Sequence, residues 1–362
     1  MITSISLSYF RNHARLHLDV DAAMVAIIGA NGAGKTNVLE ALSLFAPGRG
    51  MRSADSNDWM KEGANHGFAV RVQSKGGALA TGMQPGDNRR TVTLDDKVIA
   101  QQDLFGHLRI MWLSPEDDFV LGNGARMRRD FLDRLITALD PSHMGRVMQL
   151  QKHHSERRKI LAMPRPDSIW LKRVEQSIAE RGTAIAAGRV HFAQILHPII
   201  QQLPLNLPPV SCSVIGEIEK HLGHHPALAT EDFYASELQK SRAADVARGQ
   251  TQFGVHRSDW AIHHLGKSQP VDRCSTGEQK LMLFTIFLAA ATIVKEQFSP
   301  PILLLDECLS HLDKNNRDAI LDYMQSLGCQ VFWTGTDMPA VRGQQKIITL
   351  GSTPSAVAQK IS

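Results

Sequence analysis

The chain lacks several features that mark secreted, membrane-spanning or metal-stabilised proteins. Its four cysteines have no C-x-x-C spacing, so they indicate neither a zinc hook nor a disulfide framework. The first residues, 1–6, do not combine a charged segment with a long apolar one, so no secretory signal is expected. The longest apolar run, Leu281–Val294, is too short to span a bilayer and is expected to be a buried helix. We therefore expect a cytoplasmic protein with no membrane partner.

Composition limits the size and the charge-driven partners of the protein. With 362 residues, 43% of them hydrophobic and 21% charged, the chain can form two subdomains with a good core. The formal charge of +4 and the pI near 8.9 are compatible with a nucleic-acid partner, but a local basic patch matters more than the net sum. There is no fixed-period repeat and no sustained heptad pattern, so long coiled-coil arms are not expected.

Near the start, one phrase fits the complete P-loop pattern G-x-x-x-x-G-K-[ST], with glycines where the backbone must bend around an anion. It lies between an apolar run typical of a buried strand, Ala23–Ile28, and a helical pattern, Asn37–Leu42. Lys35 would contact the β- and γ-phosphates, and Thr36 would be a hydroxyl ligand of Mg²⁺. The predicted nucleotide-binding residues are Gly29, Ala30, Asn31, Gly32, Ala33, Gly34, Lys35, Thr36 and Asn37.

Far along the chain, four apolar residues, Ile302–Leu305, end in Asp306 and Glu307. Alone, this pair is most simply a solvated turn after a buried strand. With a P-loop upstream it indicates a Walker B strand, in which Asp306 holds Mg²⁺ through water and Glu307 polarises the attacking water. Phosphoryl transfer needs positioning and charge neutralisation, so Glu307 and Lys35 are the predicted catalytic residues.

Ser275–Gln279 would by itself be an ordinary helix cap with a capping box. Its place about 30 residues before Asp306 is more specific, because the arrangement resembles that of ABC-type ATPases. This resemblance implies that Ser275 and Gly277 contact the γ-phosphate of an ATP held by the partner subunit. It also implies that Asp313 belongs to a loop that couples the two sites of a head-to-tail homodimer. ATP and Mg²⁺ are the expected cofactors.

The order of patterns along the chain predicts an α/β protein with an inserted helical part. Residues 1–115 would form the N-terminal part of a mixed-sheet lobe I, and 116–250 an inserted helical lobe II. Residues 251–362 would supply the signature helix, Walker B and the C-terminal part of the ATPase lobe. The expected strands and helix outside the motifs are Ile2–Leu7, Ala14–Val20, Gly67–Gln73, Thr91–Leu94, Lys314–Leu327 and Gln330–Thr334.

Several local phrases narrow the likeness, over nearly the whole chain, to the RecF family. They are Tyr9–His13, Gly48–Arg52, Leu113–Asp117, Arg128–Asp133 and Gly254–Asp259. In the last phrase, Val255 stands where the family has proline. The resemblance implies a DNA repair, replication and recombination protein, active in the response to DNA damage. It would be an ATP-dependent DNA-binding dimer that hydrolyses ATP, acts at single-strand gaps and duplex junctions, and works with RecO and RecR to help place RecA.

Two other functions fit parts of the pattern. The nucleotide-binding subunit of a membrane transporter is disfavoured, because such subunits have a switch histidine where this chain has Thr334–Thr336 and a much shorter distance from P-loop to signature. A different SMC-like ATPase with long arms or a fused nuclease is disfavoured by the missing coiled coil.

The residues that would contact DNA stay open in the sequence. The segments with Arg126, Arg128, Arg129 and Arg134, and the run His153–Lys159, could be basic faces that grip phosphates or solvated faces paired with local acids. Arg11 could reach the nucleotide or its P-loop, or it could form a surface ion pair. His256 and Arg257 could lie near an interface, or be a packed histidine and a salt-bridged arginine.

Overall fold

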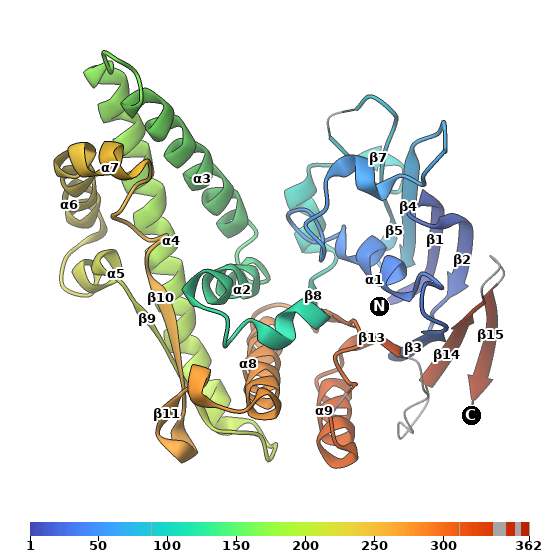
Figure 1. Cartoon of the computed structure of the whole chain (residues 1–362). Helices are drawn as coiled ribbons and strands as arrows, with labels where there is room; N and C mark the ends of the chain where they lie inside the picture. Colours follow the sequence, from blue (N-terminus) through green and yellow to red (C-terminus); the bar gives the residue numbers. More distant parts are fainter. Residues whose placement is uncertain (88, 311, 336–344, 352–355, 362) are drawn as a thin grey trace. The chain divides into compact units, whose positions relative to one another are not determined.

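The structure is a computed structural model that describes residues 1–87, 89–310, 312–335, 345–351 and 356–361 (Figure 1). The chain divides into two compact units. Unit 1 comprises Met1–Asp118, Pro204–Leu207 and Ala290–Ser362, and unit 2 comprises Phe119–Leu203 and Pro208–Ala289. The polypeptide therefore leaves the first unit after Asp118, contributes Pro204–Leu207 to it while building the second, and completes it from Ala290 onwards.

Unit 1 contains an antiparallel sheet of six strands in the order β2-β1-β4-β5-β6-β7. The strands are β1 (Ile2–Phe10), β2 (His13–Asp19), β4 (Phe68–Ser74), β5 (Gly77–Met83), β6 (Thr91–Leu94) and β7 (Lys97–Val98). Buried and exposed residues alternate along β4, as expected for a sheet with one face on the core. Apolar alternation therefore brings this sheet onto the core of unit 1.

The second sheet of unit 1 has the order β15-β14-β3-β13-β12-β8, and all of its neighbours are parallel except β14 and β15. Its strands are β3 (Met24–Gly29), β8 (Ile110–Leu113), β12 (Ile302–Leu305), β13 (Gln330–Gly335), β14 (Gln345–Leu350) and β15 (Ala356–Ile361). All four residues of β8 and of β12 are buried, which is typical of a parallel sheet covered on both faces. The carboxyl ends of the parallel strands β3, β12 and β13 meet at one edge, where ligands bind in open α/β sheets.

The helix α1 (Lys35–Ser43) lies in the core of unit 1, in contact with β1 of one sheet and with β3, β8, β12 and β13 of the other. Val38, Leu39 and Leu42 are fully buried there. Among the described residues, the other α-helix wholly within unit 1 is α9 (Lys314–Ser326). The short 3₁₀ turns are η1 (Ser56–Trp59), η2 (Gln101–Gly106) and η3 (Pro115–Phe119), the last of which ends at the start of unit 2. The P-loop helix is therefore held by both sheets.

Unit 2 is mainly helical, with one three-stranded antiparallel sheet of order β11-β10-β9. Its helices include α2 (Ala125–Thr137), α3 (Ser142–Leu161), α4 (Ser168–Gln202), α5 (Glu217–Leu222), α6 (Ala227–Lys240) and α7 (Arg242–Arg248). Its strands and 3₁₀ turns are β9 (Val210–Ile215), β10 (Asp259–His264), β11 (Gln269–Pro270), η4 (Leu265–Lys267) and η5 (Val271–Arg273). The antiparallel neighbours α3 and α4 make the longest hairpin of this unit (Figure 1).

The helix α8 (Thr276–Gln297) begins in unit 2 and ends in unit 1. Among the described residues, it is the one helix whose length and apolar composition would allow it to cross a membrane. Its most apolar window is 78% buried inside the structure, as in the core helix of a globular protein.

The structure differs from the sequence-based expectations at the small-residue and polar strands. The strand β5 was not predicted, because glycine and alanine have low strand propensity and its place depends on pairing with β4 and β6. Within the expected helical part, β9 is a strand that pairs with β10. Unit 2 extends past β10 to Ala289, whereas the sequence-based division ended the helical lobe at residue 250.

Candidate nucleotide-binding site

The P-loop connects the end of β3 to the start of α1, with its last glycine as the N-cap of the helix. Gly34 has φ +90°, a left-handed conformation that favours glycine. A Cβ at this position would lie 2.4 Å from Nε2 of His13 and 2.7 Å from the amide nitrogen of Asn12. The close approach of the β1–β2 turn therefore requires glycine here.

This β1–β2 turn supports the P-loop from outside the motif. The Asn12 side chain donates to the Gly32 carbonyl at 3.5 Å and accepts a bond from the Asn37 amide at 2.7 Å. The ring nitrogen Nε2 of His13 lies 3.3 Å from the Gly34 carbonyl oxygen. Burial lowers the pKa of His13, although its bond to Gly34 acts in the opposite direction. In this turn, the sequence indicated only Arg11 as a possible contact of the nucleotide or its P-loop, and the roles of Asn12 and His13 were not predicted.

Lys35 lies inside the P-loop, and its side chain is 5% exposed. Its ammonium donates to the carbonyl oxygens of Gly29 at 2.9 Å and Ala30 at 3.3 Å. The same nitrogen is 3.9 Å from Oε1 of Glu307, which follows the Walker B strand. The two predicted catalytic residues are therefore neighbours in space.

Asp306 meets the P-loop helix at the carboxyl edge of the parallel sheet. Its Oδ1 accepts hydrogen bonds from the hydroxyl of Thr36 at 2.9 Å and from that of Thr334 at 2.7 Å. Thr334 also accepts a bond from the backbone N–H of Glu307 at 2.9 Å. Glu307 has φ +53°, a sparsely populated conformation of the kind found at functional sites. A single hydroxyl on β13 thus orients both carboxylate residues.

Thr334 is a site residue that the sequence analysis did not assign. The only signal was its place at the end of the strand after Walker B, where transporters have a switch histidine. The last residue of Thr334–Thr336, Thr336, lies outside the described residues.

Glu40, on α1, links two arginines to the P-loop helix. It is fully buried and accepts two bonds from Arg11, at 2.9 and 2.6 Å. Arg52 lies 3.5 Å from the same carboxylate and donates to the side chain of Asn37 at 3.2 Å. Arg11 therefore forms an ion pair, but with a fully buried carboxylate on the P-loop helix and not with a group at the surface.

The predicted signature residues lie in unit 2, at the start of α8. Ser275 is exposed, and its N–H and hydroxyl each donate to Glu278 at 3.0 Å, as in a capping box. Lys267 forms an ion pair with Glu278. The bond from Lys267 and, to a smaller extent, the bonds from Ser275 lower the pKa of Glu278 to about 2. No heavy atom lies within 4 Å of a Cβ built at Gly277, so an approaching group would meet open backbone there. The contacts of Ser275 and Gly277 with a partner's ATP stay a prediction.

Asp313 is the N-cap of α9 in unit 1. Its carboxylate accepts bonds from the backbone and the side chain of Asn316, at 3.0 and 2.6 Å, and these bonds lower its pKa. His311, two residues before Asp313, lies outside the described residues. The coupling role of Asp313 stays a prediction.

The candidate DNA-contacting arginines have internal partners in several cases. Arg128 forms two bonds with Asp259, at 2.9 and 2.7 Å, and Arg129 donates to the carbonyl of Ser258. Arg126 is 87% exposed and lies 3.8 Å from Asp130. Arg128 and Arg129 are therefore engaged in contacts that stabilise unit 2.

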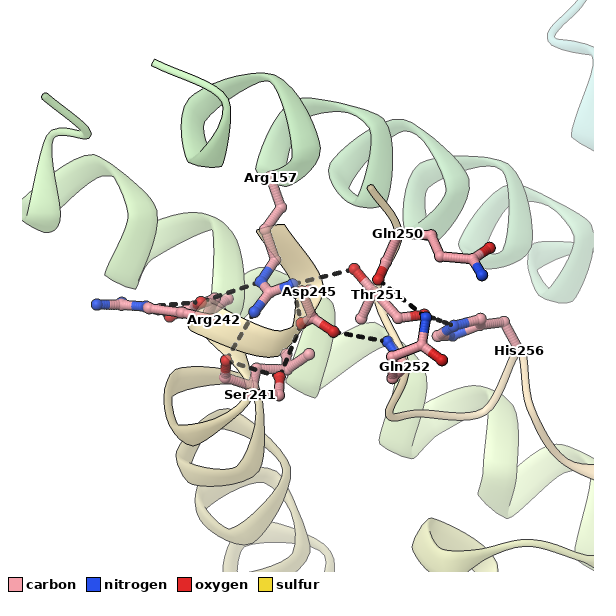
Figure 2. A network of polar contacts seen from close by, with 10 residues as sticks. Arg157, Ser241, Arg242, Asp245, Gln250, Thr251, Gln252 and His256 are labelled. Atoms are coloured by element: carbon pink, nitrogen blue, oxygen red, sulfur yellow. Dashed lines mark hydrogen bonds and ion pairs between the residues drawn. The ribbon is translucent and has the colours of Figure 1, made fainter. Parts of the chain in front are cut away.

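Arg157 is fully buried, so its assignment to a basic helix face is wrong (Figure 2). Its guanidinium donates to Glu175 at 3.0 Å, to Asp245 at 2.7 Å and to Thr251 at 3.0 Å. These carboxylates come from α4 and α7, and sequence proximity along α3 could not indicate them.

His256 is packed inside unit 2, as one of the two alternatives proposed. Its Nε2 lies 2.9 Å from the Thr251 carbonyl oxygen (Figure 2). The ring packs edge-on against His154 with centroids 4.6 Å apart. Burial lowers the pKa of both rings, that of His154 to about 3.

With this geometry established, comparisons with known proteins identify the family. The family model described as "RecF/RecN/SMC N terminal domain" matches residues 1–358. A protein of Mesorhizobium japonicum named "DNA replication and repair protein RecF" is 37% identical over 96% of both chains. This chain belongs to the RecF family. A relative of the same name from Brucella suis is 38% identical over 93% of this chain and 90% of its own.

Solved structures agree with this membership at the level of fold. The structure described as "the recombination mediator protein RecF-ATPrS in RecFOR pathway" has a TM-score of 0.86 at 22% identity, covering 100% of this chain and 98% of that one. An SmcHead structure has a TM-score of 0.52 at 16% identity over 100% and 97% of the two chains. The chain is thus a DNA replication and repair protein of the RecF family, with the ATPase fold shared with SMC heads, and the transporter alternative is not favoured.

Proposed function

We propose that the chain binds ATP with Mg²⁺ at the P-loop, dimerises around two shared nucleotides, and closes on DNA. The observation that carries this proposal is the meeting of Lys35 and Thr36 with Asp306 and Glu307, which lie about 270 residues further along the chain. A binding module that does not hydrolyse nucleotide needs no second carboxylate beside the P-loop lysine.

Magnesium fits the residues that would hold it. Asp306 is 3% exposed, and the hydroxyls of Thr36 and Thr334 contact it, while no described ion pair neutralises it. A buried carboxylate without a cation is costly, and Mg²⁺ in such sites takes one or two protein oxygens together with phosphates and water. When bound, the ion would neutralise charge on the β- and γ-phosphates.

Two side chains would then prepare the hydrolytic step. Lys35 would exchange its carbonyl partners for phosphate oxygens, since its ammonium already lies within the loop. Glu307 would hold the attacking water and take up its proton, with its backbone fixed by Thr334. Both roles are a matter of positioning, because phosphoryl transfer involves little covalent chemistry by the protein.

The partner subunit would complete each site. Ser275 and Gly277 are exposed at the start of a helix, where backbone N–H groups and the helix dipole favour an anion such as a γ-phosphate. Asp313, at the start of α9, would couple the two sites. This head-to-tail homodimer follows the family resemblance.

DNA would be the substrate on which the dimer closes. The names of the relatives support this, as does the RecFOR pathway in which the similar RecF structures are placed. We therefore propose action in the cytoplasm at single-strand gaps and duplex junctions, with RecO and RecR as partners and RecA loading as the outcome. Phosphate contacts would dominate, so affinity would fall steeply with salt and depend little on sequence.

The test is sedimentation of Glu307→Gln with labelled gapped duplex in Mg-ATP and in Mg-ADP, at one salt concentration. We expect a dimer that sediments with DNA only in Mg-ATP and hydrolyses ATP poorly. Glu62→Gln is the matched control, because Glu62 is exposed and forms no recorded ion pair among the described residues. Lys35→Ala should lose nucleotide binding and dimerisation.

Two outcomes would contradict parts of the proposal separately. Equal ATP turnover in the wild type and in Glu307→Gln would refute the role of Glu307. A dimer that forms in Mg-ATP but does not bind DNA would refute the proposed closure on DNA and would leave the proposed ATP-dependent dimerisation unaffected.

A further inference from the structure

One face of the α3–α4 hairpin in unit 2 combines exposed apolar side chains with exposed cations. We call it the hairpin face. It consists of Lys152, Lys159, Met163, Ile169, Trp170 and Arg173, which lie on or between α3 and α4. Residues 162–167 connect the two helices, which pack against each other, so the members of this group on α3 and on α4 lie on neighbouring helices (Figure 1).

Trp170 differs from every other tryptophan in the chain. It is 43% exposed, whereas the other four are at most 7% exposed: Trp59, Trp112, Trp260 and Trp333. Its indole Nε1 donates to Glu156 at 3.0 Å across the hairpin, which orients the ring. Met163, in the connection between the two helices, and Ile169, the residue before Trp170, are 41% and 68% exposed. The same end of the hairpin thus presents an oriented aromatic ring and two further apolar side chains to solvent.

The cations of the hairpin face have no recorded ion pair among the described residues. The acids on the same segment are already engaged. Glu156 contacts Trp170 and His153, and Asp167 caps α4 by accepting from the backbone of Ile169 and Trp170. Lys152, Lys159 and Arg173 are therefore available to an anionic partner.

Helical spacing places these cations around the ring. Lys152 and Lys159 lie four residues before and three residues after Glu156, so they share its side of α3. Arg173 lies three residues after Trp170 and shares its side of α4. The distance from Lys152 to Lys159 along the helix is about 10 Å, or about three nucleotides of a stacked strand.

The charge and size of the face select the class of partner. A second copy of this chain docked through the same face would bring like charges together, which is unfavourable. A stable protein interface needs about 800 Å² on each side with an apolar core, more than three apolar side chains provide. Duplex DNA offers phosphates but no free base face. In single-stranded nucleic acid, unpaired bases can stack on an aromatic ring while cations contact the phosphates, so this class of partner would use both the ring and the cations of the face.

We propose that the hairpin face binds single-stranded nucleic acid, with an unpaired base stacked on Trp170 and phosphates held by Lys152, Lys159 and Arg173. The inference rests on the proposed function and deepens it, because it assigns the single-stranded side of a gap to unit 2.

The first measurement is the tryptophan fluorescence of the full-length protein during titration with oligo-dT. Because the other four indoles are buried, quenching on binding reports the ring of Trp170. We expect quenching in the wild type and none in Trp170→Phe.

The second measurement is the affinity for oligo-dT and for blunt duplex in Mg-ATP. Trp170→Ala should weaken oligo-dT binding by about tenfold and leave duplex binding unchanged, whereas Trp170→Phe should retain most of the affinity. Replacing Lys152, Lys159 and Arg173 by alanine should lower the slope of log affinity against log salt by about 2. Leu228→Ala and Lys220→Ala, exposed on α6 and α5, are the matched controls.

The outcomes separate the two proposals. If the wild type binds gapped DNA in Mg-ATP and Trp170→Ala binds oligo-dT equally well, this inference is wrong and the proposed function stands. If neither the wild type nor the controls bind any DNA, both fail. Quenching by an Asp- and Glu-rich peptide, with none by oligo-dT, would overturn the inference in favour of a protein partner.

Discussion

Replacing Arg157 by methionine should destabilise the protein strongly, because this arginine links four elements of unit 2. Its guanidinium joins α3 to Glu175 on α4 and to Asp245 on α7, and it donates to the carbonyl of Leu238 on α6 at 2.6 Å. Methionine has a similar length and is apolar, so it fills the space without supplying charge. The change therefore tests the ion pairs more than the packing.

The magnitude follows from the two carboxylates that would remain. Glu175 and Asp245 are 3% and 1% exposed. Glu175 would keep its pair with Arg242, but Asp245 would keep only the Ser241 hydroxyl and the Gln252 N–H. Leaving a buried charge without its partner costs about 3–5 kcal/mol. The unfolding equilibrium constant should rise at least about a hundredfold.

The assay is urea unfolding followed by circular dichroism, with Arg158→Met as the control. Arg158 is the next residue of α3, is exposed, and has no recorded ion pair among the described residues. We expect its variant to lie within about 0.5 kcal/mol of the wild type. Similar unfolding midpoints for the two variants would refute the view that the network of Arg157 stabilises unit 2.

Three further predictions address the site and the pH dependence. Gly34→Ala should lower ATP affinity at least about tenfold in calorimetry, because its Cβ would clash with His13. Gly63→Ala is the control and should leave ATP affinity unchanged, because Gly63 has a similar φ but no atom within 4 Å of an added Cβ. Stability should fall as the pH drops from 6.5 towards 3, because the unfolded chain then protonates His154 while the folded chain does not, and His154→Phe should flatten this dependence of the urea midpoint. Ser275→Arg should leave ATP binding by the monomer intact but abolish ATP-induced dimerisation in sedimentation, since its side chain would act in the partner's site.

Local patterns in the sequence were sufficient wherever the physical signal is short-range. The P-loop strand and helix, predicted at Ala23–Ile28 and Asn37–Leu42, correspond to β3 and α1. The apolar run before Asp306 corresponds to β12, and the pattern of Lys314–Leu327 to α9. The RecF family was also correctly indicated by five short phrases along the chain, because each is a run of a few residues that can be compared with the family directly.

Contacts between distant segments were not predictable in the same way. The small residues of β5 became a strand because β4 and β6 flank it. The basic run 153–159 gave no sign that Arg157 turns inwards while Arg158 and Lys159 remain exposed. The hydroxyl of Thr334 and the β1–β2 turn acquired their roles only through neighbours 21 to 28 residues away.

By itself, the sequence determined the kind of chemistry: a glycine-rich loop, a lysine, a hydroxyl and two carboxylates, in the types and order that a nucleotide site requires. Only the tertiary structure decided which other side chains support that chemistry and which charges are free. The reason is that backbone bends and helical spacing are set within a few residues, whereas burial and charge pairing depend on elements that meet only in the folded chain. Folding buries the charged side chain of Arg157 and leaves the aromatic ring of Trp170 exposed, which is the reverse of what each residue type alone would suggest.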